Sequence, residues 1–190
     1  IGGGRRNDCI YVFGGRNDQW QELNSVECYT NNEWTAKASF QIPRMAASAV
    51  SIISIDEDDD EDHANNRIAI MGGYDGSKWL SSVELYNTTT DSWISSTTTD
   101  DDDALIPDMP LRVAFPKAVL VGNDQIVVLG TSIMTTTDID TVDEESSSTV
   151  IQNYNLTDKK WTIILSSSRQ RKLVMPLEGC TITSKVSTIY

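Results

Sequence analysis

An internal repeat is the feature of this sequence that most constrains its fold. The apolar run 10–15 ends in a glycine pair, and the same pattern returns at 68–73 and, weakened, at 126–131. Each run is followed by Val-Glu-x-Tyr or a relative of it, then by a tryptophan and later by an arginine. A self-similar period of this length is typical of repeat architectures. The repeated motif positions are Gly14, Gly15, Glu27, Tyr29, Trp34, Gly72, Gly73, Glu84, Tyr86, Trp93, Gly130, Tyr154 and Trp161.

Each period predicts four short antiparallel strands. Apolar, β-branched runs that end at glycines are typical of buried strands, and Val-Glu-x-Tyr alternates as a half-buried strand does. The polar segments 87–91 and 155–158 predict tight turns, after which the tryptophan begins the next strand. A further apolar stretch, at 46–55 and 113–121, precedes the next glycine strand. We therefore expect an all-β fold.

The order of glycine pair, Glu-x-Tyr and Trp resembles kelch repeats, in which each repeat forms a four-stranded blade of a β-propeller. The third copy departs from the pattern at Thr131 and Gln152. The resemblance implies a single kelch-repeat region over 1–190 with about three blades in an incomplete or open ring. The expected repeats span approximately 10–54, 68–122 and 126–186.

In the strand naming of that family, the innermost strand A is expected at 46–55, 115–121 and roughly 180–186. Strand B carries the glycines, strand C the Glu-x-Tyr and strand D the tryptophan. Three blades are fewer than the four to eight that usually close a ring. The chain is therefore a fragment of a longer propeller, half of a homodimer that completes a six-bladed ring, or an open arc or small ring.

The net charge of -13 is concentrated in three acidic runs. They lie in polar inserts at 56–66, 97–108 and 131–149, whose composition predicts solvated loops. Recognition of a basic peptide by these loops is the alternative, and the runs lack the turn glycine of a calcium loop. The acidity argues against nucleic acid or an anionic membrane as partner, and no apolar run is long enough to span a membrane.

The function that the resemblance implies is non-catalytic binding of a protein or peptide through loops on one face and the mouth of the central channel. The candidate partner-binding residues are Arg44, Arg112, Arg171, Trp20 and Trp79. Each arginine instead ties blades together in the alternative interpretation. The recurring Glu27 and Glu84 are expected to bond backbone or an arginine of the next blade, not to be catalytic carboxylates.

An enzyme is not expected, and neither is a cofactor or a metal site. His63 is the only histidine, which leaves no catalytic triad and no three-histidine metal site. The alternative is part of a propeller enzyme or small-ligand-binding protein whose catalytic groups lie outside this chain. Cys9, Cys28 and Cys180 are too few and too scattered for a disulfide framework. We expect free thiols in a reducing compartment, and hence a cytoplasmic location.

Overall fold

The computed structural model describes residues 9–54, 65–94, 105–132 and 148–166, which form eleven β-strands in three antiparallel sheets. The first sheet has the order β1 (Ile10–Arg16), β2 (Glu22–Thr30), β3 (Glu33–Lys37). The second has the order β4 (Ser48–Ser54), β5 (Asn65–Met71), β6 (Val83–Asn87), β7 (Ser92–Ile94). The third has the order β8 (Val113–Val121), β9 (Gln125–Ser132), β10 (Ser148–Asn155), β11 (Lys160–Ser166).

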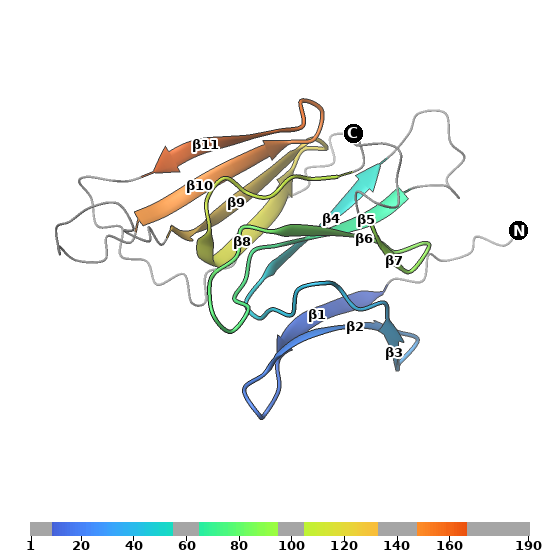
Figure 1. Cartoon of the computed structure of the whole chain (residues 1–190). Coiled ribbons are helices and arrows are strands. Elements are labelled where there is room, and N and C mark those ends of the chain that lie inside the picture. Colours follow the sequence, from blue (N-terminus) through green and yellow to red (C-terminus); the bar gives the residue numbers. More distant parts are fainter. Residues whose placement is uncertain (1–8, 55–64, 95–104, 133–147, 167–190) are drawn as a thin grey trace, which may run out of the picture.

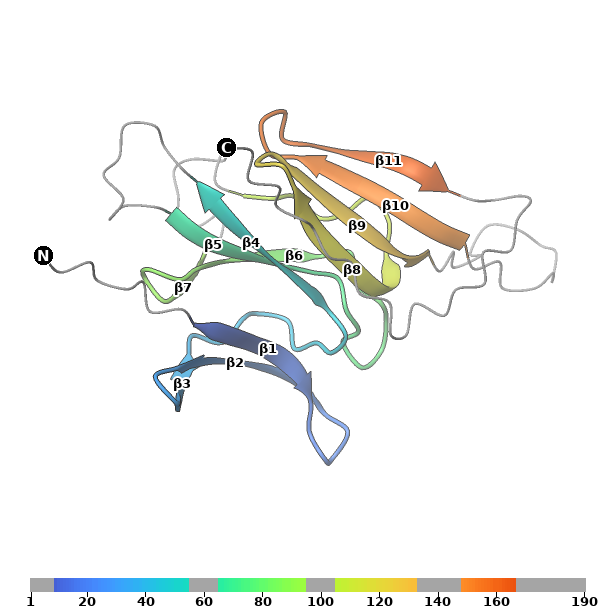
Figure 2. The same ribbon diagram turned by 180° about the vertical axis from the view of Figure 1, so that it is seen from behind.

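The second sheet lies between the other two, and the sheets form an open array in the described part of the chain (Figure 1 and Figure 2). The strand order B-C-D, A-B-C-D, A-B-C-D agrees with the order expected from the repeats, so the all-β, blade-like fold is confirmed. The final A strand expected near 180–186 lies outside the described residues. No helix in the described ranges could span a membrane.

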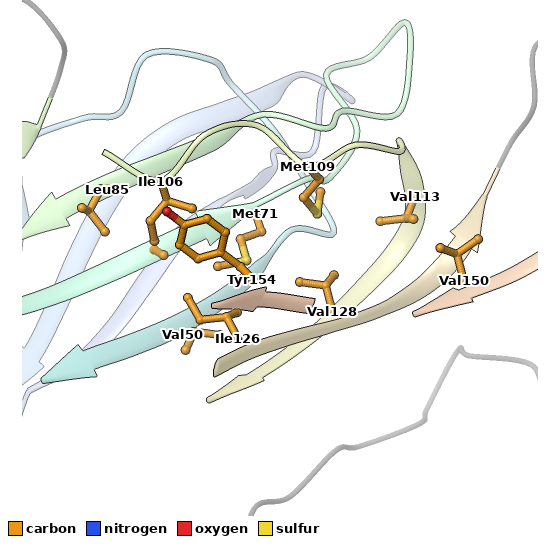
Figure 3. Packing of buried hydrophobic residues seen from close by; sticks show 11 residues of the cluster. Val50, Met71, Leu85, Ile106, Met109, Val113, Ile126, Val128, Val150 and Tyr154 are labelled. Atoms are coloured by element: carbon orange, nitrogen blue, oxygen red, sulfur yellow. The ribbon is translucent and has the colours of Figure 1, made fainter. Parts of the chain in front are cut away.

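The main core lies between the second and third sheets (Figure 3). Alternate residues of β5 and β9 point into it, as the two-residue period of a strand requires. The buried members are Val50, Ala69, Met71, Leu85, Ile106, Met109, Val113, Ile126, Val128, Val150 and Tyr154. Between the first and second sheets the packing is aromatic instead, with Tyr11 and Phe13 of β1 set edge-on against Tyr86 of β6. Each of the two interfaces thus buries one face from each of the two sheets that it joins.

The repeated glycines allow the backbone of the linker to approach the strand. Gly14 has φ +59°, and a Cβ at this position would clash with the carbonyl oxygen of Arg44 in the linker and would lie 2.8 Å from that of Leu23 in β2. Gly130 of the third sheet leaves no room either, because a Cβ there would lie 2.6 Å from the Cβ of Val113. Thr131, which replaces the second glycine, continues the β9 ladder opposite Thr149 and Ala114. The third copy therefore continues in register past Gly130, whereas β1 has a register shift between Phe13 and Gly15 and β5 ends at Met71.

A disulfide joins Cys9 to Cys28, with 5.8 Å between the two Cα atoms. The expectation of free thiols is wrong for these two residues. Cys28 pairs with Tyr11 across β1 and β2, so Cys9 is its diagonal neighbour. The 19-residue separation in sequence conceals this proximity, which arises only when the hairpin forms. The cytoplasmic location stays a prediction, but it loses the support of these thiols.

Candidate interaction face

One end of the three sheets gathers the connections from which the repeat pattern predicts partner binding. The β1–β2 turn (17–21) and the β5–β6 connection (72–82) lie at this end, as do the linkers that lead into β4 and β8 (Figure 1). We call this end the interaction face. It is defined by 17–21, 38–47, 72–82 and 105–115.

Trp20 is the most exposed aromatic residue on this face, with 75% of its surface accessible. It occupies the β1–β2 turn in the left-handed region, with φ +63°. The side-chain oxygen of Asn17 accepts hydrogen bonds from the backbone N–H groups of Gln19 and Gln21. The amide of Asn17 also donates to the Gln21 side chain. These bonds hold the turn from both sides and present the indole to solvent.

An ion pair at the base of the turn supports the Trp20 ring. Arg16 donates from Nε and Nη2 to the same oxygen of Glu22, at 3.0 and 2.6 Å. Its guanidinium carbon lies 5.2 Å from the centre of the Trp20 ring, a cation–π distance. The hydrogen bond from Arg16 holds the pKa of Glu22 below its usual value. The guanidinium of Arg16 therefore contacts both the Glu22 carboxylate and the face of the Trp20 ring.

A second aromatic cluster lies where the second and third sheets meet. The ring of Trp79 packs at a tilt against Tyr74 and Phe115, with 5.3 Å and 4.7 Å between the ring centres. Trp79 is half-buried, whereas Phe115 is exposed and has φ +50° at a bulge in β8. Backbone bonds between Tyr74 and Met45 at 2.9 and 3.0 Å tie this connection to the linker. Trp79 is thus partly a packing residue between sheets and partly surface.

The β5–β6 connection touches the first sheet at Gly76. A Cβ on Gly76 would lie 2.6 Å from Glu22 Oε2, so the tip of the β5–β6 connection rests on the first sheet. The tip is held by Asp75, whose carboxylate accepts hydrogen bonds from Ser77 and from the backbone N–H of Lys78. Burial opposes ionisation of Asp75, but these bonds outweigh it and lower its pKa. The face is therefore continuous across the first two sheets.

Arg44 is buried beneath this face, with 1% of its surface exposed. Its guanidinium donates to the carbonyl oxygens of Gly72, at 2.8 Å, and Ser82, and to the Glu84 carboxylate. Its own backbone pairs with the first sheet, through Gly15 and Leu23. Arg44 therefore links two sheets, and this geometry favours the structural alternative for Arg44 over contact with a partner.

Arg112 differs from Arg44 in its surroundings. Arg112 is exposed, and no hydrogen bond or ion pair in the described part of the chain involves its side chain. In the third sheet Gln152 occupies the position of Glu84, and its amide exchanges two hydrogen bonds with the backbone of Leu111, at 2.9 and 3.1 Å. Arg171 lies outside the described residues. Of the two candidate arginines that the structure describes, Arg112 is exposed and Arg44 is buried.

The glutamates that recur in the repeat accept hydrogen bonds from backbone N–H groups where a linker packs against them. Glu84 accepts hydrogen bonds from the N–H groups of Gln41 and Ile42 at 2.7 and 3.2 Å, besides the bond from Arg44. Glu27 is exposed. No group of three or more metal-ligating side chains occurs among the described residues, and His63 lies outside them.

Sequence reasoning missed Tyr74 and Phe115 of the face, and it missed Arg16 of β1, which supports Trp20 from outside the face. Tyr74 and Arg16 each directly follow a glycine pair, and this shared position in the repeat is the sequence feature that could have identified them as candidates. The repeat pattern predicts Phe115 in strand A, where β8 contains it, but the pattern does not predict the bulge that gives Phe115 a positive φ and turns it toward Trp79.

Comparison with known proteins identifies the repeats. The kelch motif matches residues 4–41 and 63–98, the first two copies of the pattern. Alpha-scruin of Limulus polyphemus is 45% identical over 47 residues, which are 24% of this chain and 5% of alpha-scruin. This chain thus matches only a small fraction of that relative's length.

Proposed function

Because this chain carries kelch repeats, we propose that it is a non-catalytic protein-binding module that holds its partner on the interaction face. Kelch repeats generally mediate interactions between proteins, and the family is typically non-enzymatic. The proposed partner is a protein or a peptide.

The observation that carries this proposal is the presentation of Trp20. A large apolar ring that is three-quarters exposed gains free energy when a partner covers it, and tryptophan is enriched among the residues that dominate binding. The Asn17 bonds and the Arg16 contact hold the turn in place before binding. Since less conformational entropy is lost on association, a held anchor binds more tightly than a mobile one.

The rest of the face supplies a second anchor and a charge. Trp79, with Tyr74 and Phe115, offers aromatic surface beside the first two sheets, and Arg112 offers an exposed guanidinium. An exposed guanidinium favours carboxylates on the partner. Arg171 stays part of the proposed contact set on the basis of its place in the repeat.

A quantitative pull-down tests this proposal. The 190-residue chain and its Trp20→Ala variant are immobilised and compared for every protein that they capture from cell extract. Val121→Ala is the matched control, because Val121 is also an exposed apolar residue but lies at the far end of β8. A true partner is captured by the wild type and the control, and binds Trp20→Ala at least tenfold more weakly when it is purified and titrated. Equal binding of every captured protein to Trp20→Ala would refute the assignment of Trp20.

A further inference from the structure

Two signals for N-linked glycosylation occupy equivalent turns of the second and third sheets. The signal is Asn-x-Thr, in which x is any residue except proline, and it stands at 87–89 and again at 155–157. Asn87 is the last residue of β6 and Asn155 is the last residue of β10, so each asparagine begins the turn that leads to the outer strand of its sheet. The sequence contains no other Asn-x-Ser or Asn-x-Thr triplet.

The fold itself uses the side-chain oxygen of each asparagine. Oδ1 of Asn87 accepts hydrogen bonds from the backbone N–H groups two and three residues further on, at 2.9 and 3.1 Å. Oδ1 of Asn155 accepts the equivalent two bonds, at 2.8 and 2.7 Å. An asparagine that closes a turn in this way has a structural reason to be there. That reason involves the oxygen alone, whereas a glycan is attached to the nitrogen Nδ2.

The nitrogen and the threonine of each signal contribute little to the fold. Within the described ranges, Nδ2 of Asn87 has no hydrogen-bond partner, and Nδ2 of Asn155 donates one long bond, 3.4 Å to Asp124. The hydroxyl groups of Thr89 and Thr157 form no hydrogen bond with any described residue, and both threonines are exposed. The turn therefore explains the asparagine in both copies, but it does not explain the threonine two residues later.

The first sheet shows that an asparagine in the corresponding turn does not bring a threonine with it. There the strands β2 and β3 are joined by only two residues, Asn31 and Asn32, which are exposed and have φ +51° and +64°. Neither begins a signal. Asn24 does not begin one either, and its amide donates to the carbonyl oxygen of Phe40 at 2.9 Å. The signal thus occurs only in the two turns in which four residues separate the strands.

The disulfide between Cys9 and Cys28 is an independent observation that points to the same modification. Disulfides form and persist in oxidising surroundings such as the lumen of the endoplasmic reticulum, and they are rare in the cytosol. Asn-x-Thr signals matter in proteins that follow this secretory route, where they lie in surface loops. The disulfide and the two exposed turns therefore indicate the same compartment.

We propose that Asn87 and Asn155 are N-glycosylated. In this reaction Nδ2 attacks the anomeric carbon of an oligosaccharide that is carried on a lipid diphosphate. The N–C bond forms, the C–O bond to the diphosphate breaks, Nδ2 gives up one proton, and the lipid diphosphate leaves. Oδ1 keeps both of its lone pairs, so each turn retains its hydrogen bonds in the glycosylated protein. The proposal places the chain on the secretory route, against the cytoplasmic location expected from the sequence.

The two turns lie away from the interaction face. The connection 72–82 precedes β6 and the turn 88–91 follows it, so they lie at opposite ends of that strand (Figure 1). In the third sheet β8 begins at the interaction face, and since β8, β9 and β10 alternate in direction, β10 ends at the opposite side. A bulky, hydrated glycan on either turn would therefore leave the interaction face uncovered. The inference does not depend on the proposed function.

Peptide mapping of the native protein tests the modification. The protein that contains this chain is isolated from the cells that make it, reduced and digested with trypsin, which yields fragments 79–112 and 118–159 with one signal each. Peptide-N-glycosidase in water enriched in heavy oxygen is expected to convert the glycosylated asparagine of each fragment to a labelled aspartate. Fragment 17–37 holds four asparagines and no signal, and it should stay unlabelled. A signal fragment recovered entirely without glycan would refute the assignment of its asparagine.

Variants of the threonines separate the glycan from the turn. The complete gene is expressed in a eukaryotic host, and the loss of a glycan is read as a step in gel mobility. Because the described fold uses neither hydroxyl, Thr89→Ala and Thr157→Ala are each expected to fold, as circular dichroism would show, and to lose one glycan. Thr89→Ser is expected to keep it, since serine also completes the signal.

Thr90→Ala is the matched control, because Thr90 is exposed in the same turn but lies outside the signal. It is expected to lose no glycan. A sugar that persists in Thr89→Ala, or one that resists the glycosidase, would show that the modification is not an N-glycan on Asn87 and would overturn the proposal for that residue.

Discussion

The guanidinium of Arg44 donates a hydrogen bond to the carboxylate of Glu84 where the first two sheets meet, and the two side chains are 1% and 13% exposed. The Arg44 backbone belongs to the first sheet's hydrogen-bond network and its side chain to the second. Burial lowers the pKa of Arg44, although Glu84 acts in the opposite direction. A buried charge of this kind is tolerated only because its donors are occupied.

Arg44→Met is therefore expected to destabilise the protein by about 3–5 kcal/mol, the typical cost of removing one partner of a buried ion pair. Glu84→Gln leaves the buried guanidinium of Arg44 without its counter-charge, so it is expected to cost a similar amount, about 3–5 kcal/mol. Urea unfolding followed by tryptophan fluorescence measures both. Arg16→Met is the control, because the Arg16–Glu22 pair is more exposed and is worth about 0–1 kcal/mol. Equal costs for Arg44→Met and Arg16→Met would contradict the structural role of Arg44.

Asp91 makes stability depend on acid pH. Its carboxylate accepts the backbone N–H of Ala38 at 2.8 Å and the hydroxyl of Tyr86 at 2.6 Å, and these bonds lower its pKa from 3.8. A folded-state pKa below the unfolded value gives stability that is present above pH about 4 and is lost as the pH falls through the folded value.

Asp91→Asn is accordingly expected to be less stable than the wild type at neutral pH and nearly equal to it at pH about 2. The amide oxygen of asparagine can still accept both hydrogen bonds, so the loss of stability measures the contribution of the negative charge. Unfolding curves recorded between these pH values check the convergence, with Asp158→Asn in the corresponding turn of the third sheet as the control. A difference that stays constant down to pH about 2 would exclude a charge effect.

Gly14 and Gly15 separate backbone strain from close packing, because both have positive φ but only one is crowded. A Cβ on Gly14 would lie 2.9 Å from the Phe40 ring and 2.8 Å from the Leu23 carbonyl, whereas Gly15 has nothing within 4 Å. Gly15→Ala is expected to cost about 1–2 kcal/mol for the left-handed conformation. Gly14→Ala adds about 1–3 kcal/mol for overpacking. Thermal or urea denaturation measures which variant is less stable. A Gly15→Ala variant as unstable as Gly14→Ala would contradict the prediction.

The disulfide between Cys9 and Cys28 is expected to be found as a cross-linked peptide in an unreduced digest of the purified chain. Closing a loop of this length stabilises by about 3 kcal/mol in the chain-entropy account, so Cys9→Ser is expected to lose about that much. Wild type with added reductant should match Cys9→Ser. Free alkylation of both thiols in the folded, unreduced protein would show that the bond is absent.

Local patterns were sufficient to predict the strands and their order. Buried strands such as 68–71 are recognised by apolar, β-branched side chains with a period of two. Turns such as 155–158 are recognised by an asparagine whose side-chain oxygen accepts hydrogen bonds from backbone N–H groups two and three residues further on. These requirements act between residues close in sequence, so the sequence carried them. The structural role of Glu84 was predicted for the same reason, because a carboxylate that recurs with the fold serves the fold.

The candidate site was only partly predictable, because equivalent positions met different neighbours. Trp20 and Trp79 follow equivalent glycine pairs, yet Trp20 is 75% exposed on its turn, whereas Tyr74 and Phe115 pack against Trp79. Cys9 and Cys28 come together only through the β1–β2 register. No pattern within one segment encodes such contacts.

The sequence by itself thus determined a repeating all-β chain with its strand order, its turns and its glycine positions, since these depend on neighbours along the chain. Only the tertiary structure decided which equivalent residues are buried and which are exposed. Arg44 and Arg112 follow the same repeat pattern, but only Arg44 has a carboxylate, that of Glu84, at the equivalent position of its sheet. In the third sheet that position holds the neutral Gln152, which forms hydrogen bonds with the backbone of Leu111. A side chain's environment depends on the sheet packed against it, and that sheet lies tens of residues away.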